Sequence, residues 1–415
     1  MPKIRSITTF VDLTPDVADA TIARMGAFLE DASQAFAKTG YQIQTRRMAT
    51  QPFSSGLAPD GPESVPQLAA EFFALCQSQN INYLSLGPVR LQDDPRYIEV
   101  IGEIFRRTSG VFATVSIAEP DQGISLLRLW QTAVLIDRVS RITPDGMTNL
   151  YLAALANCPP GSPFFPVAYH GAGPAQFALA IQAADIAVWA FSKAATPAVA
   201  RERLIGAIQS TVDQLVPVAE ALAEKHGIGF GGFDFSLAPY PVDAESLGGA
   251  LEALGPSFGG AGLVASAALV MNAVESANFP RAGFCGLMLP ILEDSVLAAR
   301  AAEGRLTVND LLLLSAVCGT GLDCIPLPGE VGIAALHDIL LDVAALALRL
   351  DKPLTARLMP FPEKQAGDML EFEFEFFAGS RVLAGPVSTT RPNSALGQTG
   401  PSPEDLFQIK PRPKR

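Results

Sequence analysis

The sequence predicts an α/β protein folded as a single barrel of about ten strands. Strand-like stretches alternate with amphipathic, helix-like stretches across short joints, which is typical of parallel βαβ units. Nearly every strand is joined to the next by a helix, and this strand number fits a closed or nearly closed barrel better than an open sheet. Hydrophobic residues make up 49% of the 415 residues and charged residues only 17%, which predicts large buried elements.

The elements follow from periodicity and from the residues that start and stop them. Residues 3–13 combine apolar and β-branched side chains as a strand does, and a turn with a proline opens an amphipathic helix over residues 17–38. Further strands are expected over residues 41–48, 82–89, 110–117, 164–169, 227–237, 283–290, around Asp323, 354–360 and 370–378. Further helices are expected over residues 65–77, 95–107, 126–142, 148–156, 174–226 with a break near 195–197, 264–276, 294–303, 308–316 and 333–350.

Domain organisation is predicted to be simple. No linker and no internal repeat divides residues 1–390, so they are expected to form one domain. Residues 391–415 are rich in proline, glycine and serine and are expected to form a polar tail that is flexible or wrapped on the surface. The most apolar run, residues 258–274, is too short and too mixed in composition to span a bilayer, so a buried helix is expected there.

Composition also narrows the partners and the compartment. A net charge of −12 argues against nucleic-acid binding, which needs a basic face. The first residues lack the apolar core of a signal peptide, and the five cysteines show no CxxC spacing, as in reduced cytoplasmic proteins. The sequence therefore predicts a cytoplasmic protein with a small-molecule ligand and no membrane or nucleic-acid partner, and it leaves homo-oligomer formation open.

Residues 315–330 are the stretch around which candidate chemistry gathers. A leucine-rich helix leads to Cys318 and two glycines, and a short apolar strand then carries Asp323 and ends before Glu330. A thiol and two carboxylates among small residues are expected to form one wall of a pocket. Asp323 and Glu330 are candidate acid–base groups and Cys318 is a candidate nucleophile; an inert buried thiol is the alternative, because no base adjoins it.

Two glycine-rich turns are candidate sites for an anionic ligand. His170 is followed by Gly171 and Gly173 at a predicted junction between a strand and a helix, where free backbone N–H groups and the imidazole can hold an anion. A second such turn precedes the predicted helix over residues 264–276, and its glycines are Gly259, Gly260 and Gly262. The alternatives are that the first turn only packs His170 and that the second only allows close helix packing.

Polar side chains at predicted strand ends complete the set of candidates. Asp234 and Ser236 share one face of a strand end, and Asp234 is a candidate acid–base group, unless it caps a neighbouring helix or turn. Glu293 and Asp294 precede a helix, where acids complement the helix dipole; together with Asp234 they are candidate ligands for Mg²⁺ or Ca²⁺. Arg357 stands in an apolar strand, as expected of a cation that pairs with a buried carboxylate or an anionic ligand.

Five of these segments together resemble domain-of-unknown-function family 711, also known as uncharacterised protein family 0210. The segments are FGGFDFSLAP (230–239), FGGAGLVASAAL (258–269), CGLMLPILED (285–294), VCGTGLDCIPLPGE (317–330) and TARLMPFPEKQAGD (355–368). The similarity extends over nearly all of residues 1–388. It implies a ten-stranded barrel similar to those of pyruvate formate-lyase-like glycyl radical enzymes and the ribonucleotide reductase large subunit.

The chain departs from the glycyl radical enzymes at their signature positions. Their Arg-Val-x-Gly-Tyr type of loop corresponds to residues 380–386 here, which hold an extra residue and no aromatic side chain. Their paired cysteines are absent, because Cys318 stands alone and Cys324 follows six positions later. The family's usual Pro-Gly-Asp-Thr is Pro-Gly-Glu-Val at residues 328–331, so Glu330 keeps the acid and the hydroxyl is lost. Chemistry without a glycyl radical is therefore expected.

Two hypotheses of function follow. In the first, the protein is an enzyme that acts on a small anionic metabolite inside the barrel, with His170 or Arg357 holding the anion. In the second, it is a non-catalytic ligand-binding or regulatory protein on a degenerate barrel. A raised pKa of Asp323 or Glu330 in a water-filled cavity that touches Cys318 favours the enzyme, and a cavity filled by phenylalanine and leucine favours the second hypothesis.

Overall fold

The structure, a computed structural model, describes residues 3–58, 60–390, 394–397 and 406–411. The strands are β1 (Lys3–Val11), β2 (Ile43–Thr50), β3 (Tyr83–Val89), β4 (Val111–Glu119), β5 (Gly123–Ser125), β6 (Leu152–Ala156), β7 (Gln176–Gln182), β8 (Gly229–Asp234), β9 (Gly321–Pro328), β10 (Leu354–Phe361), β11 (Met369–Leu370), β12 (Ser380–Arg381) and β13 (Leu406–Phe407). The α-helices are α1 (Ala18–Lys38), α2 (Val65–Ser78), α3 (Arg96–Glu99), α4 (Ile101–Arg107), α5 (Leu126–Ser140), α6 (Ala184–Phe191), α7 (Pro197–His226), α8 (Leu247–Ala253), α9 (Leu263–Ser276), α10 (Ser295–Ala302), α11 (Val308–Ser315) and α12 (Ile333–Leu350).

A large, mostly parallel sheet forms the centre of this mixed α/β fold. Its eleven strands follow the order β8-β7-β1-β2-β3-β4-β6-β10-β9, with β5 and β13 attached beside β4. Strands β1, β2, β3, β4 and β6 run parallel to one another. The pairs β7–β8 and β9–β10 are each parallel internally and join this block antiparallel, through β1 and β6. At one end of the sheet, the five strands of the parallel block therefore begin and the other four strands, β7 to β10, end.

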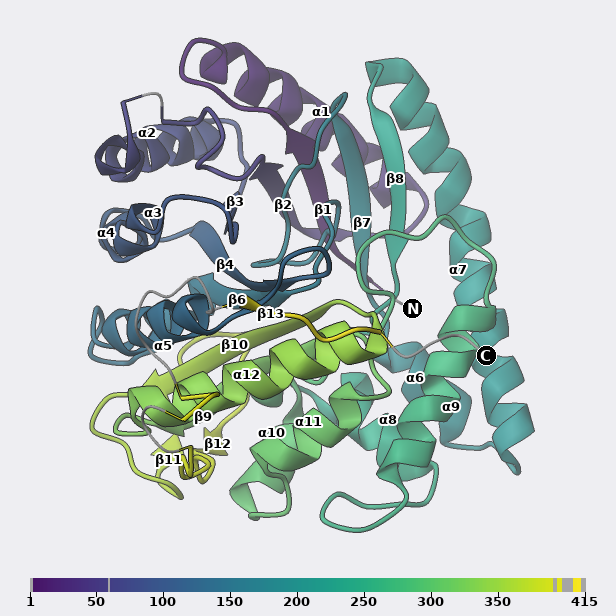
Figure 1. The fold of residues 1–415 in the computed structure, drawn as a ribbon. Coiled ribbons are helices and arrows are strands. Elements are labelled where there is room, and N and C mark those ends of the chain that lie inside the picture. Colours follow the sequence, from purple (N-terminus) through teal and green to yellow (C-terminus); the bar gives the residue numbers. More distant parts are fainter. Residues whose placement is uncertain (1–2, 59, 391–393, 398–405, 412–415) are drawn as a thin grey trace.

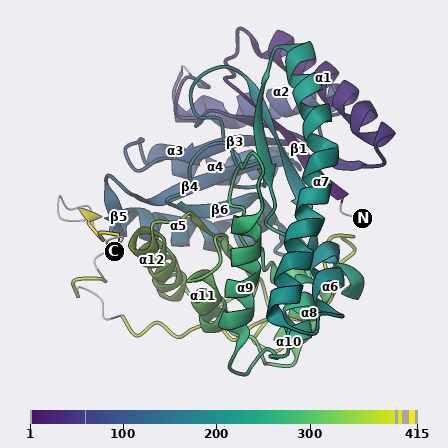
Figure 2. The same ribbon diagram turned by 90° about the vertical axis from the view of Figure 1, so that its right-hand side faces the viewer.

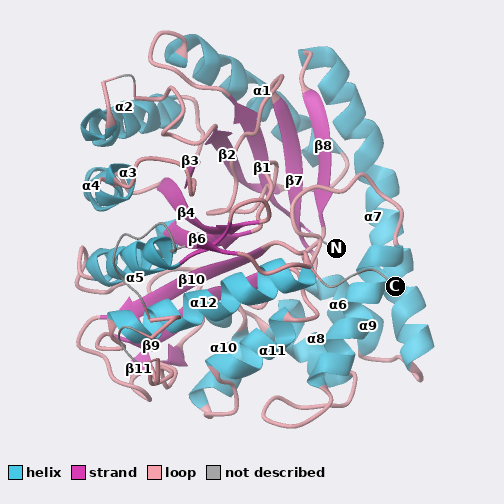
Figure 3. Cartoon of the chain, in the orientation of Figure 1, coloured by secondary structure: helices cyan, strands magenta, loops and turns pink. Residues whose placement is uncertain are grey.

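Helices surround the strands on the outer side of the curved sheet (Figure 1, Figure 3). The amphipathic helix α1 buries the face that carries Ile22, Met25 and Phe28, and helix α7 lies beside it along the outside (Figure 2). Helix α7 begins where the Thr196 side chain caps its first turn and ends at Gly227, which has φ of 60°. None of the helices in the described ranges combines the length and the apolar character needed to cross a membrane.

A loop between β6 and β7 lies against the other face of the sheet. Thr8 of β1 donates a hydrogen bond to the carbonyl oxygen of Pro163 at 2.8 Å, and Ser85 of β3 donates to that of Ala168 at 2.6 Å. Phe165 of this loop packs in a small apolar cluster with Phe112 of β4, separate from the main core that the helices cover. The loop thus fills the inner side of the sheet with backbone and aromatic side chains.

Residues 281–290 lie between β8 and β9, the two end strands of the sheet order. The first residue of this segment bridges in parallel to Phe233 of β8, and the last bridges in parallel to Asp323 of β9. The Met288 amide donates to the Ser236 carbonyl oxygen at 2.9 Å. Only isolated bridges form because φ is positive at Gly283 and Cys285, a conformation that interrupts a regular strand.

Five predicted elements differ in the structure. The predicted helix over residues 148–156 is a short 3₁₀ helix, Met147–Tyr151, followed by β6, and residues 176–182 of the predicted helical region form β7. Both segments are short, alanine-rich, buried runs, in which periodicity cannot separate helix from strand. The predicted strands over residues 164–169 and 283–290 are irregular, and that over 370–378 is strand only at Met369–Leu370. In the predicted tail, the two residues of β13 pair with β5. Only residues 394–397 and 406–411 of the tail belong to the described part of the chain.

Candidate functional site

A small buried pocket lies at the end of the sheet where β1 to β4 begin and where the chain leaves β8 and β10. Its cavity volume is about 60 Å³. Its charged wall consists of Arg5, Arg47, Arg357, Glu293 and Asp323. Its aromatic wall consists of Tyr83, Phe112, Phe164, Phe165, Phe374 and Phe376. Thr45, Leu150, Ala238 and Met288 complete the lining.

The two carboxylates of the pocket are held by arginines. Nε of Arg357 donates to Asp323 at 2.6 Å, and Nη2 of Arg357 donates to Glu293 at 3.1 Å. Glu293 also accepts from Nη2 of Arg5 at 2.8 Å, and the Cys324 thiol lies 3.5 Å from its other oxygen. All five side chains are buried. Glu293 therefore joins Arg5 of the first strand to Arg357 of β10.

Protonation in this cluster follows from burial and charge. Burial raises the pKa of the Asp323 carboxyl, and the Arg357 guanidinium works against that rise. Burial lowers the pKa of Arg357, but the negative charges of Asp323 and its neighbours outweigh it, so the net direction is upward. Burial raises the pKa of the Cys324 thiol well above its usual value, so this sulfur is a neutral hydrogen-bond donor.

Arg47 differs from the other two arginines because no carboxylate of the described residues lies within ion-pair distance of it. Its Nε donates to the Thr45 hydroxyl at 2.9 Å, and its guanidinium lies over the rings of Tyr83 and Phe165 at 5.6 and 5.1 Å. The residue is only 8% exposed. Burial, together with the positive charge of Arg5, lowers the pKa of Arg47. Three guanidinium groups and two carboxylates leave the pocket with one excess positive charge.

A second donor in the pocket also lacks a partner. Nη1 of Arg5 is buried and makes no hydrogen bond to any residue in the described part of the chain. The guanidinium of Arg5 is stacked on Phe376, with 4.6 Å from its central carbon to the ring centre. Arg5 and Arg47 lie on the neighbouring strands β1 and β2, so the two unmatched donors belong to the same wall.

The alternation of side chains along β2 explains why Arg47 faces the pocket. Thr45 and Arg47 point to one face of the strand, and Arg46 between them points to the other. On that outer face Arg46 bonds to Glu30 at 2.7 Å and to Ser33 at 2.9 Å, both on α1. Two adjacent arginines therefore serve opposite faces of the sheet.

One group of potential metal ligands occurs within the described ranges: Glu293, Asp323 and Cys324, whose ligand atoms lie within 4.8 Å of one another. Arg5 and Arg357 already donate to the carboxylate oxygens of this group. A divalent cation here would lie beside two guanidinium groups, an arrangement that oxygen-ligand metal sites avoid. The residues present therefore fit an arginine–carboxylate cluster better than a metal ion.

The predicted metal ligands Asp234, Glu293 and Asp294 lie in different bonding networks. Asp294 is the N-cap of α10 and accepts from the backbone of Val296 and Leu297, besides Ser246 and Gly248. Asp234 accepts from the Ser236 hydroxyl and from the backbone N–H groups of Phe284 and Cys285. Glu293 alone of the three lines the pocket. Both aspartates therefore hold backbone in place, and burial raises the pKa of Asp234 to about 6.

The other predicted site residues are spread over the molecule. Of all of them, Asp323, Glu293 and Arg357 meet in the pocket. Cys318 is 1% exposed, joins the main core and does not line the pocket, and Glu330 is exposed after the end of β9. His170 is buried near the opposite end of β2, where its amide donates to the Thr50 carbonyl oxygen at 2.8 Å.

The predicted glycine turns lie away from the pocket. Gly171 and Gly173 follow His170, and the carbonyl oxygen of Gly173 lies 3.3 Å from Nε2 of the imidazole. Gly259, Gly260 and Gly262 form an exposed loop before α9. Ser236 donates to Asp234 and accepts from the Gly286 amide at 3.1 Å. These residues stabilise turns around the sheet, and none of them lines the pocket.

Sequence analysis missed Arg5, Arg47 and most of the aromatic wall. A signal was present for Arg5, which stands in a predicted strand rich in apolar and β-branched residues, much as Arg357 does. Arg47 had no such signal, because it follows Arg46 in a stretch that alternates with polar residues. The alternating Glu–Phe run over residues 371–377 was a second signal, since it presents Phe374 and Phe376 to one side.

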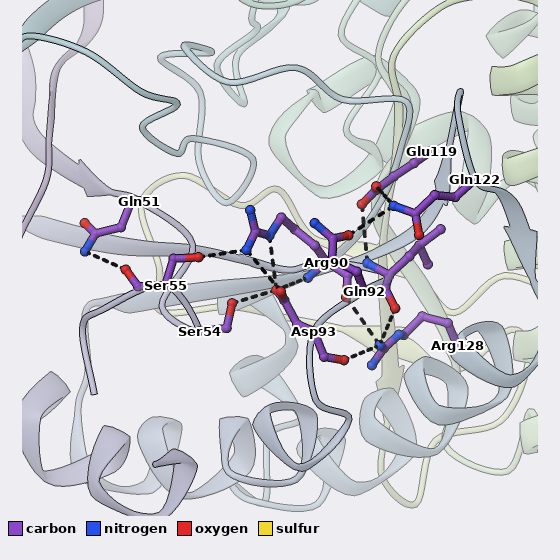
Figure 4. A network of polar contacts seen from close by, with 10 residues as sticks. Gln51, Ser54, Ser55, Arg90, Gln92, Asp93, Glu119, Gln122 and Arg128 are labelled. Atoms are coloured by element: carbon purple, nitrogen blue, oxygen red, sulfur yellow. Dashed lines mark hydrogen bonds and ion pairs between the residues drawn. The ribbon is translucent and has the colours of Figure 1, made fainter. Parts of the chain in front are cut away.

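A second arginine–carboxylate network lies near the carboxyl ends of β3 and β4 (Figure 4). Nη2 of Arg90 contacts Asp93 at 3.1 Å and Ser55 at 2.7 Å, and Asp93 also accepts from Ser54 at 2.6 Å. Glu119 accepts from Gln122 at 2.7 Å. This network holds loops together at the end of the strands opposite the pocket.

The fold and the pocket define an α/β protein with a small buried site that is aromatic on one side and carries excess positive charge on the other. The chain belongs to the family described as Uncharacterised ACR (DUF711), whose model matches residues 1–378. This match confirms the family predicted from the five segments.

Relatives of this family share most of their length with the chain. UPF0210 protein MK1214 of Methanopyrus kandleri is 29% identical over 399 residues, which cover 92% of this chain and 88% of the relative. A UPF0210 protein of Pyrobaculum arsenaticum is 30% identical over 395 residues, covering 88% and 86%. One of Neisseria gonorrhoeae is 26% identical over 350 residues, covering 81% and 78%. The names of these relatives state no activity.

Proposed function

We propose that the protein binds a small organic anion in this pocket, with the anionic group held by Arg47. The observation that carries the proposal is the excess charge: Arg47 is buried, and no described carboxylate lies within ion-pair distance of it. A buried charge without a partner is costly, and proteins pair such charges with acids or with ligands. An anion beside Arg47 would supply the missing partner.

The free edge of the guanidinium suits such a ligand. Nε of Arg47 is occupied by Thr45, whereas its two Nη atoms donate to no residue in the described part of the chain. These two atoms form a fork that matches the geometry of a carboxylate or phosphate. The rings of Tyr83 and Phe165 hold the guanidinium plane in position, so little ordering remains to be done on binding.

Acid–base catalysis on the bound anion is the second candidate function. Asp323 lines the pocket, and burial raises the pKa of its carboxyl, which is the direction that acid–base catalysis needs. Cys318, Glu330, Asp234 and His170 do not line the pocket, so this proposal assigns the proton transfer to Asp323 alone. A ligand-binding protein without catalysis needs Arg47 and the aromatic wall but not the titration of Asp323.

The finer architecture belongs to the same proposal. Residues 281–290 bridge to β8 on one side and to β9 on the other, both in parallel. We take this segment as a tenth, irregular strand that completes a cylinder of the kind predicted from sequence, with the pocket inside. A cytoplasmic location is likewise a proposal, supported by five cysteines that are all free of disulfides.

The test is ligand-induced stabilisation with a matched pair of arginine variants. Acetate, butyrate, octanoate and inorganic phosphate are titrated against the thermal and urea unfolding of wild type, Arg47→Gln and Arg46→Gln, at constant ionic strength set with sodium chloride. A ligand present at 100 times its Kd is expected to stabilise wild type by about 2.7 kcal/mol. The effect should disappear in Arg47→Gln and persist in Arg46→Gln, whose side chain faces α1. Equal stabilisation of all three proteins would show that Arg47 holds no anion.

A further inference from the structure

We infer that the natural ligand is a monocarboxylic acid with an elongated apolar body, whose carboxylate lies at Arg47 and whose body extends into an adjoining groove. This inference rests on the proposed function and adds the chemical class of the ligand. It depends on the charge balance of the pocket, on its small volume, and on the lining of the groove beside it.

The charge balance selects a single negative charge. Arg357 is matched by Asp323 and shares Glu293 with Arg5, so those contacts use two positive and two negative charges and leave one guanidinium over. A carboxylate beside Arg47 brings the cluster to neutrality. A phosphate dianion or a dicarboxylate would add a further negative charge close to Glu293 and Asp323, where burial makes repulsion strong.

The volume of the pocket limits what can lie entirely within it. A cavity of about 60 Å³ holds a few water molecules or a carboxylate with one or two carbons, and it is smaller than the cavities of about 150 Å³ that take up benzene. A larger ligand must therefore place only its head group there. The rest of the molecule needs a path out of the pocket.

A groove of about 870 Å³ provides that path. Leu150 and Phe374 line both cavities, so the groove and the pocket adjoin at these two side chains. Beyond them its apolar lining includes Met147, Tyr151, Phe361, Met369, Leu370 and Phe372. The groove also has four charged residues: Asp145, Lys364, Glu371 and Glu373. All four are exposed.

A pocket with a positively charged wall that adjoins an apolar groove suits an amphipathic acid. Burying an apolar chain in the groove removes its surface from water, whereas a polar sugar or a nucleotide would lose hydrogen bonds there. The aromatic side chains of the pocket and of the groove offer flat apolar surfaces but few groups that can hydrogen-bond to polar substituents of a ligand.

The experiment is a chain-length series measured by calorimetry on the full chain, with sodium acetate, butyrate, hexanoate and octanoate below their aggregation limits. The affinity is expected to rise about three- to fourfold per methylene group as the body enters the groove. Octyl phosphate should bind at least tenfold more weakly than octanoate above pH 8, where it is a dianion. Octanol, which lacks the charge, should bind more weakly still.

A groove variant separates the head from the body. Met369 is 48% exposed and lines only the groove, so Met369→Glu should fold normally. It is expected to weaken octanoate binding several-fold and to leave acetate binding unchanged.

Two different failures can be told apart. If acetate and octanoate bind with equal affinity, or octyl phosphate binds as tightly as octanoate, the inferred ligand class is wrong while the anion site at Arg47 stands. If neither the acids nor inorganic phosphate binds, or if Arg47→Gln binds them all as wild type does, both the inference and the proposed function are wrong.

Discussion

Two arginine–carboxylate clusters lie at opposite ends of the same strands, and they differ in how their charges are matched. In the loop network of Figure 4, Arg90 and Arg128 stand with Asp93 and Glu119, and Nη2 of Arg128 donates to three backbone carbonyl groups. In the pocket, three arginines face two carboxylates. The numbers of charges in the first cluster are equal, and those in the second are not.

The difference distinguishes a structural network from a binding site. In the loop network, the acids accept from arginine, serine, glutamine or backbone donors on the loops that meet there. In the pocket, Nη1 of Arg5 is buried without a partner in the described ranges. The Nη atoms of Arg47 donate to no described residue, and both arginines line the cavity. Unmatched donors beside a cavity indicate what the cavity can receive.

The largest predicted effect concerns Arg357, which holds both pocket carboxylates. Arg357→Met leaves Asp323 and Glu293 buried with only Arg5 as a partner, and removing one member of a buried pair costs about 3–5 kcal/mol. Arg90→Met in the loop network, where the side chain is partly exposed, is expected to cost about 1 kcal/mol. Urea unfolding of both variants at pH 7 measures the difference. Equal losses would mean that burial does not distinguish the two clusters.

A third polar cluster extends the comparison, because its acid is matched by backbone amides and not by arginine. Burial raises the pKa of Asp234 to about 6. The folded protein then binds this proton more tightly than the unfolded chain, so Asp234 contributes stability at low pH that is lost as the pH rises from about 4 through 6. Between pH 4 and pH 7, wild type should lose about 2 to 3 kcal/mol relative to Asp234→Asn.

The measurement is urea unfolding of both proteins at half-unit steps of pH, and only the difference between the two curves is used, because other acids titrate in both. Curves that stay parallel over this range would show that the amides of Phe284 and Cys285 keep Asp234 ionised in spite of its burial.

The unmatched charge of Arg47 predicts an effect of opposite sign. Replacing it by methionine removes a buried cation that has no acid partner in the described residues and keeps most of its apolar contact with Tyr83 and Phe165. Without ligand, Arg47→Met should raise the free energy of unfolding by about 1 kcal/mol. Arg46→Met loses the contact with Glu30 and should lower it by up to about 1 kcal/mol. A loss of stability in both variants would indicate that Arg47 is compensated within the folded protein.

Much of the fold could be predicted because its periodic signals are long. Helices α1 and α12 present buried faces at helical spacing, and the predicted ranges 17–38 and 333–350 match them within one residue. β7 and β6 could not be predicted, because each is a short apolar run buried on both sides, where tertiary context decides the conformation.

The site was predictable only in part, for a physical reason. Asp323, Glu293 and Arg357 were found because acids and a cation stand out in apolar segments near glycine and proline. Arg47 was missed because its neighbour is also an arginine, and a sequence alone does not show which of two adjacent residues faces inward. Cys318 was predicted to face the pocket, but it lies in the turn between α11 and β9 and packs in the main core.

A predicted effect no larger than that of Arg47→Met lies at the junction between pocket and groove. Phe374→Ala removes the ring that lines both cavities, so a branched acid should fit the widened passage better. The affinity for 2-ethylhexanoate relative to octanoate should rise by about 1 kcal/mol, measured by calorimetry. Phe372→Ala, which alters the groove alone, is the control and should leave this ratio unchanged. If both variants change the ratio equally, the passage beside Phe374 does not limit what reaches Arg47, and the ligand enters the pocket by another route.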